Sequence, residues 1–292
     1  MPLDGEVADS THAYRFAEAH PDRFFEMYIA EQLMLGAAVG MQARGWKPYV
    51  ATFAAFLTRA YDFVRMAAIG RADLRLCGSH AGVAIGEDGP SQMGLEDLAA
   101  FGAVHSSTVL YPCDANQTAR LVEAMADLDG ISYLRTSRGA TPVIYEPDEE
   151  FAVGGSKVVR ASNRDEVTLV GAGVTLHEAL RAADRLAEDG VAARVIDLYS
   201  VKPADAETLI AAARETGAIV TVEDHWPHGG LGDAVLAALA DAGATARVRK
   251  LAVGKMVGSG TPAELLREAG IDSGHIAAAA TSLVEVPVLA NR

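Results

Sequence analysis

The sequence predicts an α/β protein made of two doubly wound domains whose sheets are mainly parallel. Helical patterns alternate with short β-branched or apolar runs from about Phe24 to Arg138, and the alternation resumes after position 156. Residues 139–156 separate the two series; they are rich in Gly, Pro and acidic side chains and lack sustained periodicity, which indicates a linker. A chain of 292 residues is long enough for two such domains, which we expect at residues 1–150 and 151–292.

In the first domain, the expected strands are apolar runs bounded by Gly, Pro or Asp, with helices between them. The strands are Pro48–Thr52, Leu74–Ser79, Ser107–Tyr111 and Ile131–Thr136, and the helices are Ala30–Met41, Phe56–Met66, Leu95–Phe101 and Asn116–Asp127. Gly36 and Gly40 share one face of the first helix because residues four apart lie above one another. We expect close packing on that face, either against the sheet of the same domain or against another subunit.

The second domain repeats this organisation. Its expected strands are Val167–Gly171, Ala193–Leu198, Ala218–Glu223 and Val248–Val253, and its helices begin near Thr175, Pro203 and Leu231. The turn at residues 171–173 is not a dinucleotide-binding fingerprint, because Leu176 stands where the third glycine is needed. The segment from Glu223 to His228 carries metal-capable side chains but lacks the i, i+4 spacing of a zinc site. We expect it to be a loop at the carboxyl ends of the strands that could contribute to assembly.

The composition excludes several classes of function. Half of the residues are hydrophobic and 22% are charged, as in a soluble globular protein. The net charge of −14 argues against nucleic acid as the main partner, since phosphate backbones attract clustered Lys and Arg. Two cysteines are too few for a disulfide framework, which fits a cytoplasmic location. Neither a targeting signal nor an apolar run of about 20 residues is visible, so no membrane segment is expected.

Two short segments suggest a site for a planar ring beside a carboxylate. Glu31 lies at the end of an apolar run where a helix rich in Gly and Ala begins, a position that the helix dipole alone would favour for an acidic residue. Downstream, Phe53 and Phe56 stand three residues apart at a junction between strand and helix. A planar ring could stack on aromatic side chains placed in this way.

The segment from Cys77 to Gln92 carries the densest set of polar groups. Four glycines and Pro90 indicate an irregular loop after a strand, which is where open α/β sheets bind their ligands. The loop contains the imidazole of His80, the carboxylates of Glu87 and Asp88, a hydroxyl and an amide. Each group alone would be unremarkable, since a single His is usually structural and an Asp-Gly pair usually marks a turn.

In this order, the motifs resemble those of the transketolase family, and most closely the form found in vertebrates. The resemblance covers nearly the whole chain and implies a thiamine-pyrimidine-binding domain at 1–150 and a transketolase C-terminal domain at 151–292. The matching segments are Ile29–Gln32, Thr52–Phe56, Arg59–Asp62, Cys77–His80, Gly86–Met93, Tyr133–Arg138, Gly171–Leu180, Val222–His225, Gly229–Gly232 and Gly258–Leu266.

The resemblance implies an enzyme that uses thiamine diphosphate to move a two-carbon ketol unit from a ketose phosphate to an aldose phosphate. Glu31 then becomes the catalytic carboxylate, which shares a proton with N1′ of the pyrimidine and so promotes the tautomer that draws the proton from the thiazolium C2. Sharing a proton also spares a buried carboxylate an isolated charge. Phe53 and Phe56 would wall the aminopyrimidine ring, with Arg59 and Gln92 as further cofactor contacts.

The same resemblance implies a substrate site. His80, Arg138 and Ser10 correspond to the residues that bind the sugar phosphate, and these side-chain types suit a phosphate dianion. Asp88 would contact the C2 hydroxyl of the substrate. Gln92 would lie near the reacting carbon atoms, at a position where microbial and plant members commonly carry histidine.

Family motifs for the other half of the cofactor site are missing. No Gly-Asp-Gly occurs in the chain, and neither does the metal-binding Asn that follows it in the family. We therefore expect no metal ligands here and a partner, an N-terminal diphosphate-binding subunit, that holds Mg²⁺ or Ca²⁺ in an α₂β₂ assembly. The sugar itself stays open, since separate subunits also occur in transketolases with specialised substrates.

Two other functions are compatible with parts of the sequence. The β subunit of a 2-oxo-acid dehydrogenase E1 component shares both domains, but the segment from Gly86 to Gln92 and the set Ser10, His80 and Arg138 speak against it. A non-catalytic assembly protein could also keep the fold. Loss of Glu31 or of its aromatic wall would favour that reading, and both are present.

Overall fold

The computed structural model describes residues 1–285 and contains two sheets. The first has seven strands in the order β10-β5-β6-β4-β3-β1-β2, and the second has five in the order β12-β11-β8-β9-β7. Among the described residues, the only antiparallel neighbours are β5 with β10 and β7 with β9. The prediction of an α/β fold with mainly parallel sheets is therefore confirmed.

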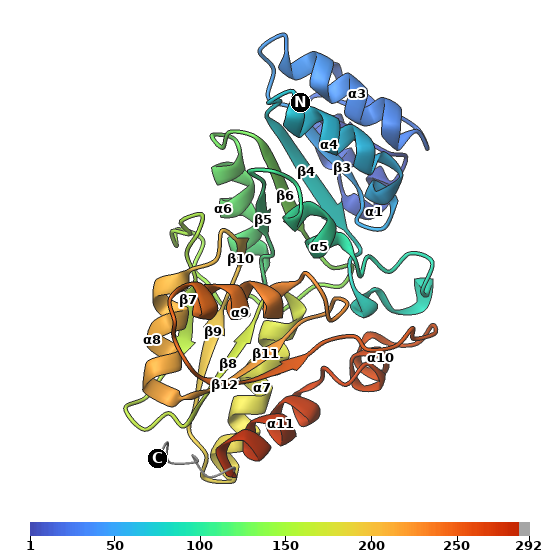
Figure 1. The fold of residues 1–292 in the computed structure, drawn as a ribbon. Helices are drawn as coiled ribbons and strands as arrows, with labels where there is room; N and C mark the ends of the chain where they lie inside the picture. Colours follow the sequence, from blue (N-terminus) through green and yellow to red (C-terminus); the bar gives the residue numbers. More distant parts are fainter. Residues whose placement is uncertain (286–292) are drawn as a thin grey trace.

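The first sheet is formed mostly by the first half of the chain (Figure 1). Its strands are β1 (Pro2–Asp4), β2 (Phe25–Glu26), β3 (Tyr49–Phe53), β4 (Leu74–Ser79), β5 (Thr108–Leu110), β6 (Ile131–Arg135) and β10 (Ser200–Lys202). The helical segments of this half are α1 (Ala8–Thr11), α2 (Tyr14–Ala19), η1 (Pro21–Arg23), α3 (Glu31–Gln42), η2 (Phe56–Ala60), α4 (Tyr61–Ile69), η3 (Val83–Asp88), α5 (Asp97–Gly102) and α6 (Ala115–Met125), where η marks a 3₁₀ helix.

The second sheet belongs to the second half of the chain. Its strands are β7 (Lys157–Arg160), β8 (Val167–Gly171), β9 (Ala193–Asp197), β11 (Ala218–Val222) and β12 (Arg247–Leu251). Its helices are α7 (Val174–Glu188), α8 (Ala206–Thr216), α9 (Leu231–Asp241), α10 (Pro262–Glu268) and α11 (Ser273–Glu285). None of the helices in residues 1–285 is long and apolar enough to cross a bilayer.

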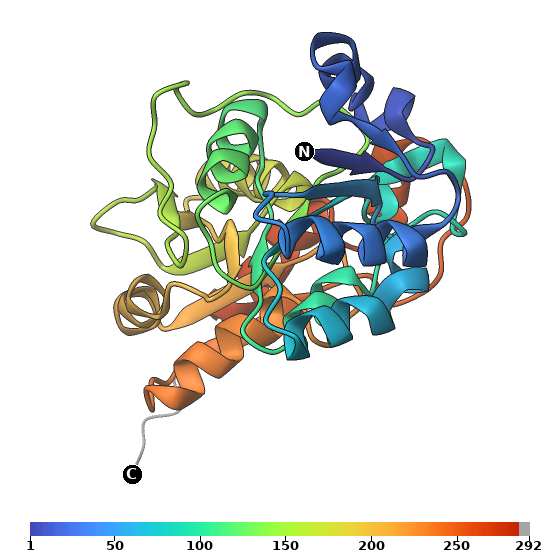
Figure 2. The same ribbon diagram turned by 90° about the horizontal axis from the view of Figure 1, so that it is seen from above.

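Helices cover both faces of each sheet, as a doubly wound fold requires. Viewed from above, α3 and α4 lie side by side on the outer face of the first sheet (Figure 2). They share one hydrophobic core with α5, α8 and α9, whereas α6, α7 and α11 pack into a second core. Each core contains buried residues from both halves of the chain, so the two sheets fold as one packed unit.

Most expected elements are present, with bounds shifted by a few residues. Strands β4 and β8 have the predicted bounds. The helix expected at Phe56–Met66 is divided into η2 and α4, because Ala60 between them leaves helical geometry with a φ of −107°. Strands β1, β2, β7 and β10 were not predicted; each has two to four residues, too few for an alternating pattern to appear. Strand β10 also leaves the second half of the chain to pair with β5 of the first sheet.

The two glycines of α3 face outward. A Cβ on Gly36 would meet only the Phe63 ring, at 3.9 Å, and a Cβ on Gly40 would meet no atom within 4 Å. Both residues are exposed. The first of the two alternatives, packing against the sheet of the same domain, is therefore wrong.

The parallel order brings the predicted site residues to one edge of the first sheet. Ser10 follows β1, Glu31 follows β2, Phe53 ends β3, His80 follows β4 and Arg138 follows β6. Carboxyl ends of parallel strands meet at the same edge, which is where such sheets bind ligands. The fold thus brings together residues that are up to 107 positions apart in the sequence, counted from Glu31 to Arg138.

Candidate active site

Glu31 is a buried carboxylate at the start of α3. The chain turns sharply between β2 and α3, where Tyr28 adopts a positive φ of 55°. Glu31 is then the first residue of α3 and only 2% exposed. Its charge has a partner, because Nη1 of Arg59 donates a hydrogen bond to Oε1 of Glu31 at 2.5 Å. The Arg59 side chain is 47% exposed, so a buried carboxylate is paired with a cation that reaches solvent.

An aromatic wall stands beside this ion pair. Phe53 ends β3 and Phe56 begins η2, and their rings stack with centroids 5.1 Å apart and an interplanar angle of 16°. The guanidinium of Arg59 lies 4.7 Å above the Phe56 ring, because residues three apart in a 3₁₀ helix lie above one another. The predicted contacts Glu31, Phe53, Phe56 and Arg59 are therefore brought together in one place.

His80 extends the wall. Its ring stacks on Phe53 at 3.8 Å and 9°, a contact that sequence reasoning did not foresee. The residue has a positive φ of 56°, which directs the side chain back over the sheet edge and is uncommon for a residue other than glycine. Burial lowers the pKa of His80 to about 4, although the nearby carboxylate of Asp88 opposes the shift. At neutral pH this imidazole is uncharged and acts through hydrogen bonds.

The polar loop that continues from His80 to Gln92 lies above the wall, and Arg138 holds it in place. Nη1 of Arg138 donates to Oε2 of Glu87 at 2.8 Å and to the carbonyl of Ile85 at 3.2 Å, and it lies 3.7 Å from Oδ1 of Asp88. The backbone N–H of Gln92 donates to the carbonyl of Gly89 at 3.2 Å, which closes the loop. The structure therefore gathers His80, Asp88 and Arg138 as predicted, with Arg138 already occupied by acidic neighbours.

Ser10 lies outside this cluster. It is exposed on α1, which is held by Asp4 through hydrogen bonds from the N–H of Val7 at 2.7 Å and the hydroxyl of Thr11 at 3.0 Å. His12, which ends this helix, lines a cavity of about 500 Å³ together with Ser137 and Arg138. Ser10 is absent from the lining of that cavity. His12 is the residue that sequence reasoning missed; its only signal was its place two residues after Ser10.

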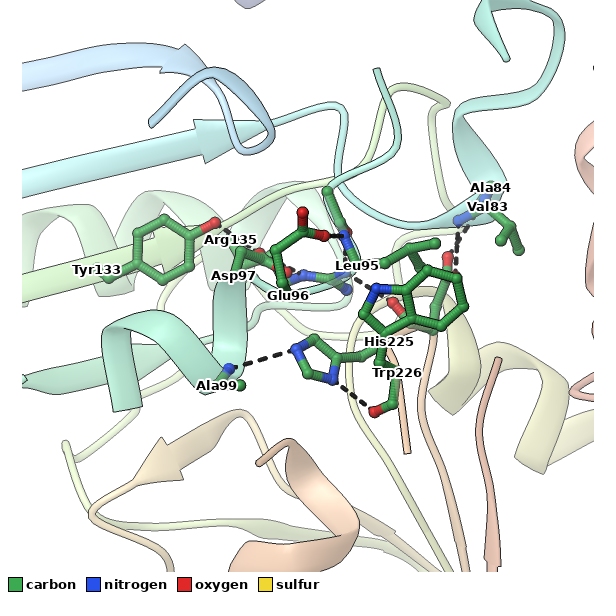
Figure 3. A network of polar contacts seen from close by, with 12 residues as sticks. Val83, Ala84, Leu95, Glu96, Asp97, Ala99, Tyr133, Arg135, His225 and Trp226 are labelled. Carbon is green, nitrogen blue, oxygen red and sulfur yellow. Dashed lines mark hydrogen bonds and ion pairs between the residues drawn. The ribbon is translucent and has the colours of Figure 1, made fainter. Parts of the chain in front are cut away.

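A buried polar network fixes the loop to the second half of the chain (Figure 3). Nε of Arg135 donates to Oδ2 of Asp97 at 2.8 Å, and Nη2 of Arg135 donates to the carbonyl of Asp224 at 2.7 Å. The Asp224 carboxylate in turn accepts the backbone N–H groups of Val83 at 2.7 Å and Ala84 at 3.2 Å. The loop after β11, which was expected to lie at the strand ends and to contribute to assembly, thus joins the two halves of the chain.

The residues present fit one end of thiamine diphosphate. A buried carboxylate beside stacked aromatic rings suits a flat aminopyrimidine that donates a hydrogen bond. The diphosphate end differs, because it needs a metal and donors for several phosphate oxygens. Within residues 1–285, no group of three or more His, Cys, Asp or Glu side chains is placed to hold a metal ion.

Comparison with known proteins agrees with this geometry. The family model described as "Transketolase, pyrimidine binding domain" matches residues 2–143, and "Transketolase, C-terminal domain" matches residues 156–276. Mouse transketolase is 51% identical over 287 residues, which are 97% of this chain and 46% of that protein. Bovine transketolase-like protein 1 is 51% identical over 276 residues, or 94% of this chain and 46% of that protein. The chain thus spans about half the length of the curated relatives it matches.

A solved structure matches over most of the length of both chains. It is described as "Split gene transketolase, inactive beta4 tetramer", is 36% identical, and superposes with a TM-score of 0.87 over 97% of this chain and 91% of that chain. The similarity therefore extends over both of the matched family domains of this chain.

Proposed function

The chain belongs to the transketolase family, and from that premise we propose that it supplies the pyrimidine half of a thiamine diphosphate site. The enzyme would transfer a two-carbon ketol unit from a ketose phosphate to an aldose phosphate. The observation that carries the proposal is the buried carboxylate of Glu31 beside the stacked rings of Phe53 and Phe56. A 2-oxo-acid dehydrogenase subunit is less well supported, because the named relatives at about half identity are transketolases.

In this proposal, Glu31 holds the proton that is shared with N1′ of the pyrimidine. Its position at 2% exposure excludes water from that proton and strengthens the hydrogen bond. Phe56, supported from behind by Phe53 and His80, orients the ring so that N1′ faces the carboxylate. When bound, thiamine diphosphate supplies the carbon nucleophile and the electron sink of the transfer.

The substrate residues would act above this wall. Arg138 is exposed and can exchange Glu87 for a sugar phosphate, since a phosphate dianion attracts a guanidinium more strongly than one carboxylate does. His80, neutral at pH 7, would donate a hydrogen bond to the same substrate. Asp88 would contact the C2 hydroxyl of the substrate, and Gln92 would lie near the reacting carbon atoms. Ser10 is exposed on α1 and would have to reach the phosphate from outside the cavity that His12 and Arg138 line.

We place the diphosphate half of the site on a partner subunit, in an α₂β₂ assembly. An exposed apolar surface, which we call the partner face, runs along α3 and α4 from the end that carries Glu31. Its side chains are exposed by 43–71%: Tyr28, Ile29, Leu33, Phe63, Met66 and Ile69. Exposed apolar surface of this kind is typical of a protein interface. Gly36 and Gly40 lie on the same helix and would allow a partner backbone to approach closely.

The occupant of the partner face is the diphosphate-binding transketolase subunit, which would also hold Mg²⁺ or Ca²⁺. Glu31 would bind the cofactor at its pyrimidine end. The groups that bind the diphosphate end must lie within the length of the cofactor, so the second subunit must lie beside α3. The split-gene relative is described as an "inactive beta4 tetramer". That description supports a need for another chain in this protein too.

The test is reconstitution. The chain is mixed with a transketolase diphosphate-domain chain, thiamine diphosphate and Mg²⁺, and ketol transfer from xylulose 5-phosphate to ribose 5-phosphate is followed. Glu31→Gln should lower turnover by about 10²-fold or more without impairing assembly. Glu207→Gln is the matched control, since Glu207 is also in the first turn of a helix but is exposed on α8. Unchanged turnover in Glu31→Gln would refute the role assigned to Glu31, whereas no turnover in the unmodified mixture would favour a non-catalytic protein.

A further inference from the structure

The position of Arg59 in this chain coincides with the position that the aminopyrimidine ring would need. Nη1 of Arg59 donates to Glu31 at 2.5 Å while its guanidinium stacks 4.7 Å above Phe56. A pyrimidine bound as proposed must make the same two contacts, one to the same carboxylate and one to the same ring. Both groups cannot occupy that space at once.

The chemistry of the two groups is alike. A guanidinium is a planar, delocalised cation with N–H donors along its edge and faces that stack on aromatic rings. An aminopyrimidine protonated at N1′ is also planar, donates an N–H from its edge and stacks on aromatic faces. Glu31 and Phe56 therefore recognise either group with the same hydrogen bond and the same stacking contact.

Arg59 is freer to move than the residues around it. Glu31 is 2% exposed and Phe53 is 5% exposed, so both are fixed by packing. The Arg59 side chain is 47% exposed and can turn into solvent. In the absence of a ring, the guanidinium spares Glu31 an unpaired buried charge, which would be costly.

We propose that Arg59 occupies the pyrimidine subsite in the free chain and must leave it for the cofactor to bind. This inference rests on the proposed function, because it takes the pyrimidine contacts from it. It changes the role expected of Arg59, which is a competitor of the ring rather than one of its contacts. Every cofactor that binds must displace the ion pair with Glu31, so Arg59 lowers the affinity for thiamine diphosphate.

The first test uses the free chain and a probe without phosphates, 4-amino-5-hydroxymethyl-2-methylpyrimidine. Binding is followed by saturation-transfer NMR. Arg59→Met, which keeps the length of the side chain but removes the planar cation, should bind the probe where the unmodified chain does not. Arg160→Met is the control, because Arg160 is 40% exposed and paired with Asp184 at 2.8 Å on the second sheet. Equal binding by the unmodified chain and Arg59→Met would overturn the inference.

The second test measures thiamine diphosphate binding by calorimetry in the complex with the diphosphate subunit. Arg59→Met should tighten binding by roughly fivefold or more, a typical size for coupling between competing contacts. The gain should disappear in the Glu31→Gln background, where Arg59 has lost its ionic partner. Weaker binding in Arg59→Met would mean that Arg59 contacts the cofactor, contrary to the inference. If the unmodified complex binds no thiamine diphosphate, the proposed function has failed, and the inference falls with it.

Discussion

Asp224 fills the space that a side chain on Gly82 would need: a Cβ built on Gly82 would lie 2.1 Å from Oδ2 of Asp224. Gly82 also has a φ of +80° and a ψ of 178°, a conformation that is essentially restricted to glycine. The carboxylate can therefore reach the N–H groups of Val83 and Ala84 only because residue 82 has no side chain. This contact fixes the start of η3, the loop that carries Asp88, to the second half of the chain.

Gly82→Ala should therefore lower the free energy of unfolding by about 3 kcal/mol, since it combines backbone strain with a displaced buried carboxylate. Urea unfolding measures the change. Gly102→Ala is the control, because Gly102 ends α5 without a positive φ and an added Cβ there meets no atom within 4 Å. Equal effects of the two substitutions would contradict the importance of the contact.

Two substitutions of Gly40 test the partner face, one in the free chain and one in the complex. Gly40→Ala should stabilise the free chain by about 0.5–1 kcal/mol, because alanine favours a helix and the added Cβ meets no atom within 4 Å. Gly40→Arg should fold normally but lose association with the diphosphate subunit, since it places a charged side chain against an apolar interface. Sedimentation velocity of the mixture measures this loss.

The control for the partner face is Ala240→Arg, which adds the same side chain at an exposed position of α9. It should leave association unchanged. Assembly of the Gly40→Arg chain with unchanged affinity would show that the partner subunit binds elsewhere.

His80 should titrate far below an ordinary histidine. Burial lowers its pKa to about 4 in the folded chain, whereas an unfolded histidine has a pKa of about 6.5. As pH falls from 6.5 towards 4, the unfolded chain takes up the proton first, so this residue removes stability over that range. The C2 proton of His80 in an NMR titration, assigned with His80→Asn, should therefore have a midpoint near 4. A midpoint near 6.5 would contradict the buried stack on Phe53.

The sequence predicted those features that depend on local patterns. Strands β4 and β8 are short segments rich in apolar residues, and their bounds were predicted correctly because such a segment with flanking turn residues is typical of a buried strand. The gathering of Phe53, His80 and Arg138 at one edge follows from parallel strand order, which the alternation of helices and strands indicates.

Contacts between distant segments were not predictable. Asp224 and Val83 are 141 residues apart, and no local pattern marks their hydrogen bond. The pairing of β10 with β5 crosses from one half of the chain to the other and involves three residues of β10. The ion pair of Arg59 with Glu31 depends on how η2 and α3 pack against each other, which the sequence does not show. Arg59 was therefore predicted from the sequence motif to be a cofactor contact.

We propose that this chain holds a catalytic carboxylate for a cofactor whose other end a second chain must bind. Ketol transfer from xylulose 5-phosphate to ribose 5-phosphate, measured with this chain alone and with the mixture in the presence of thiamine diphosphate and Mg²⁺, tests it most directly. We expect turnover only in the mixture, and only while Glu31 is intact. Turnover by this chain alone would contradict the claim.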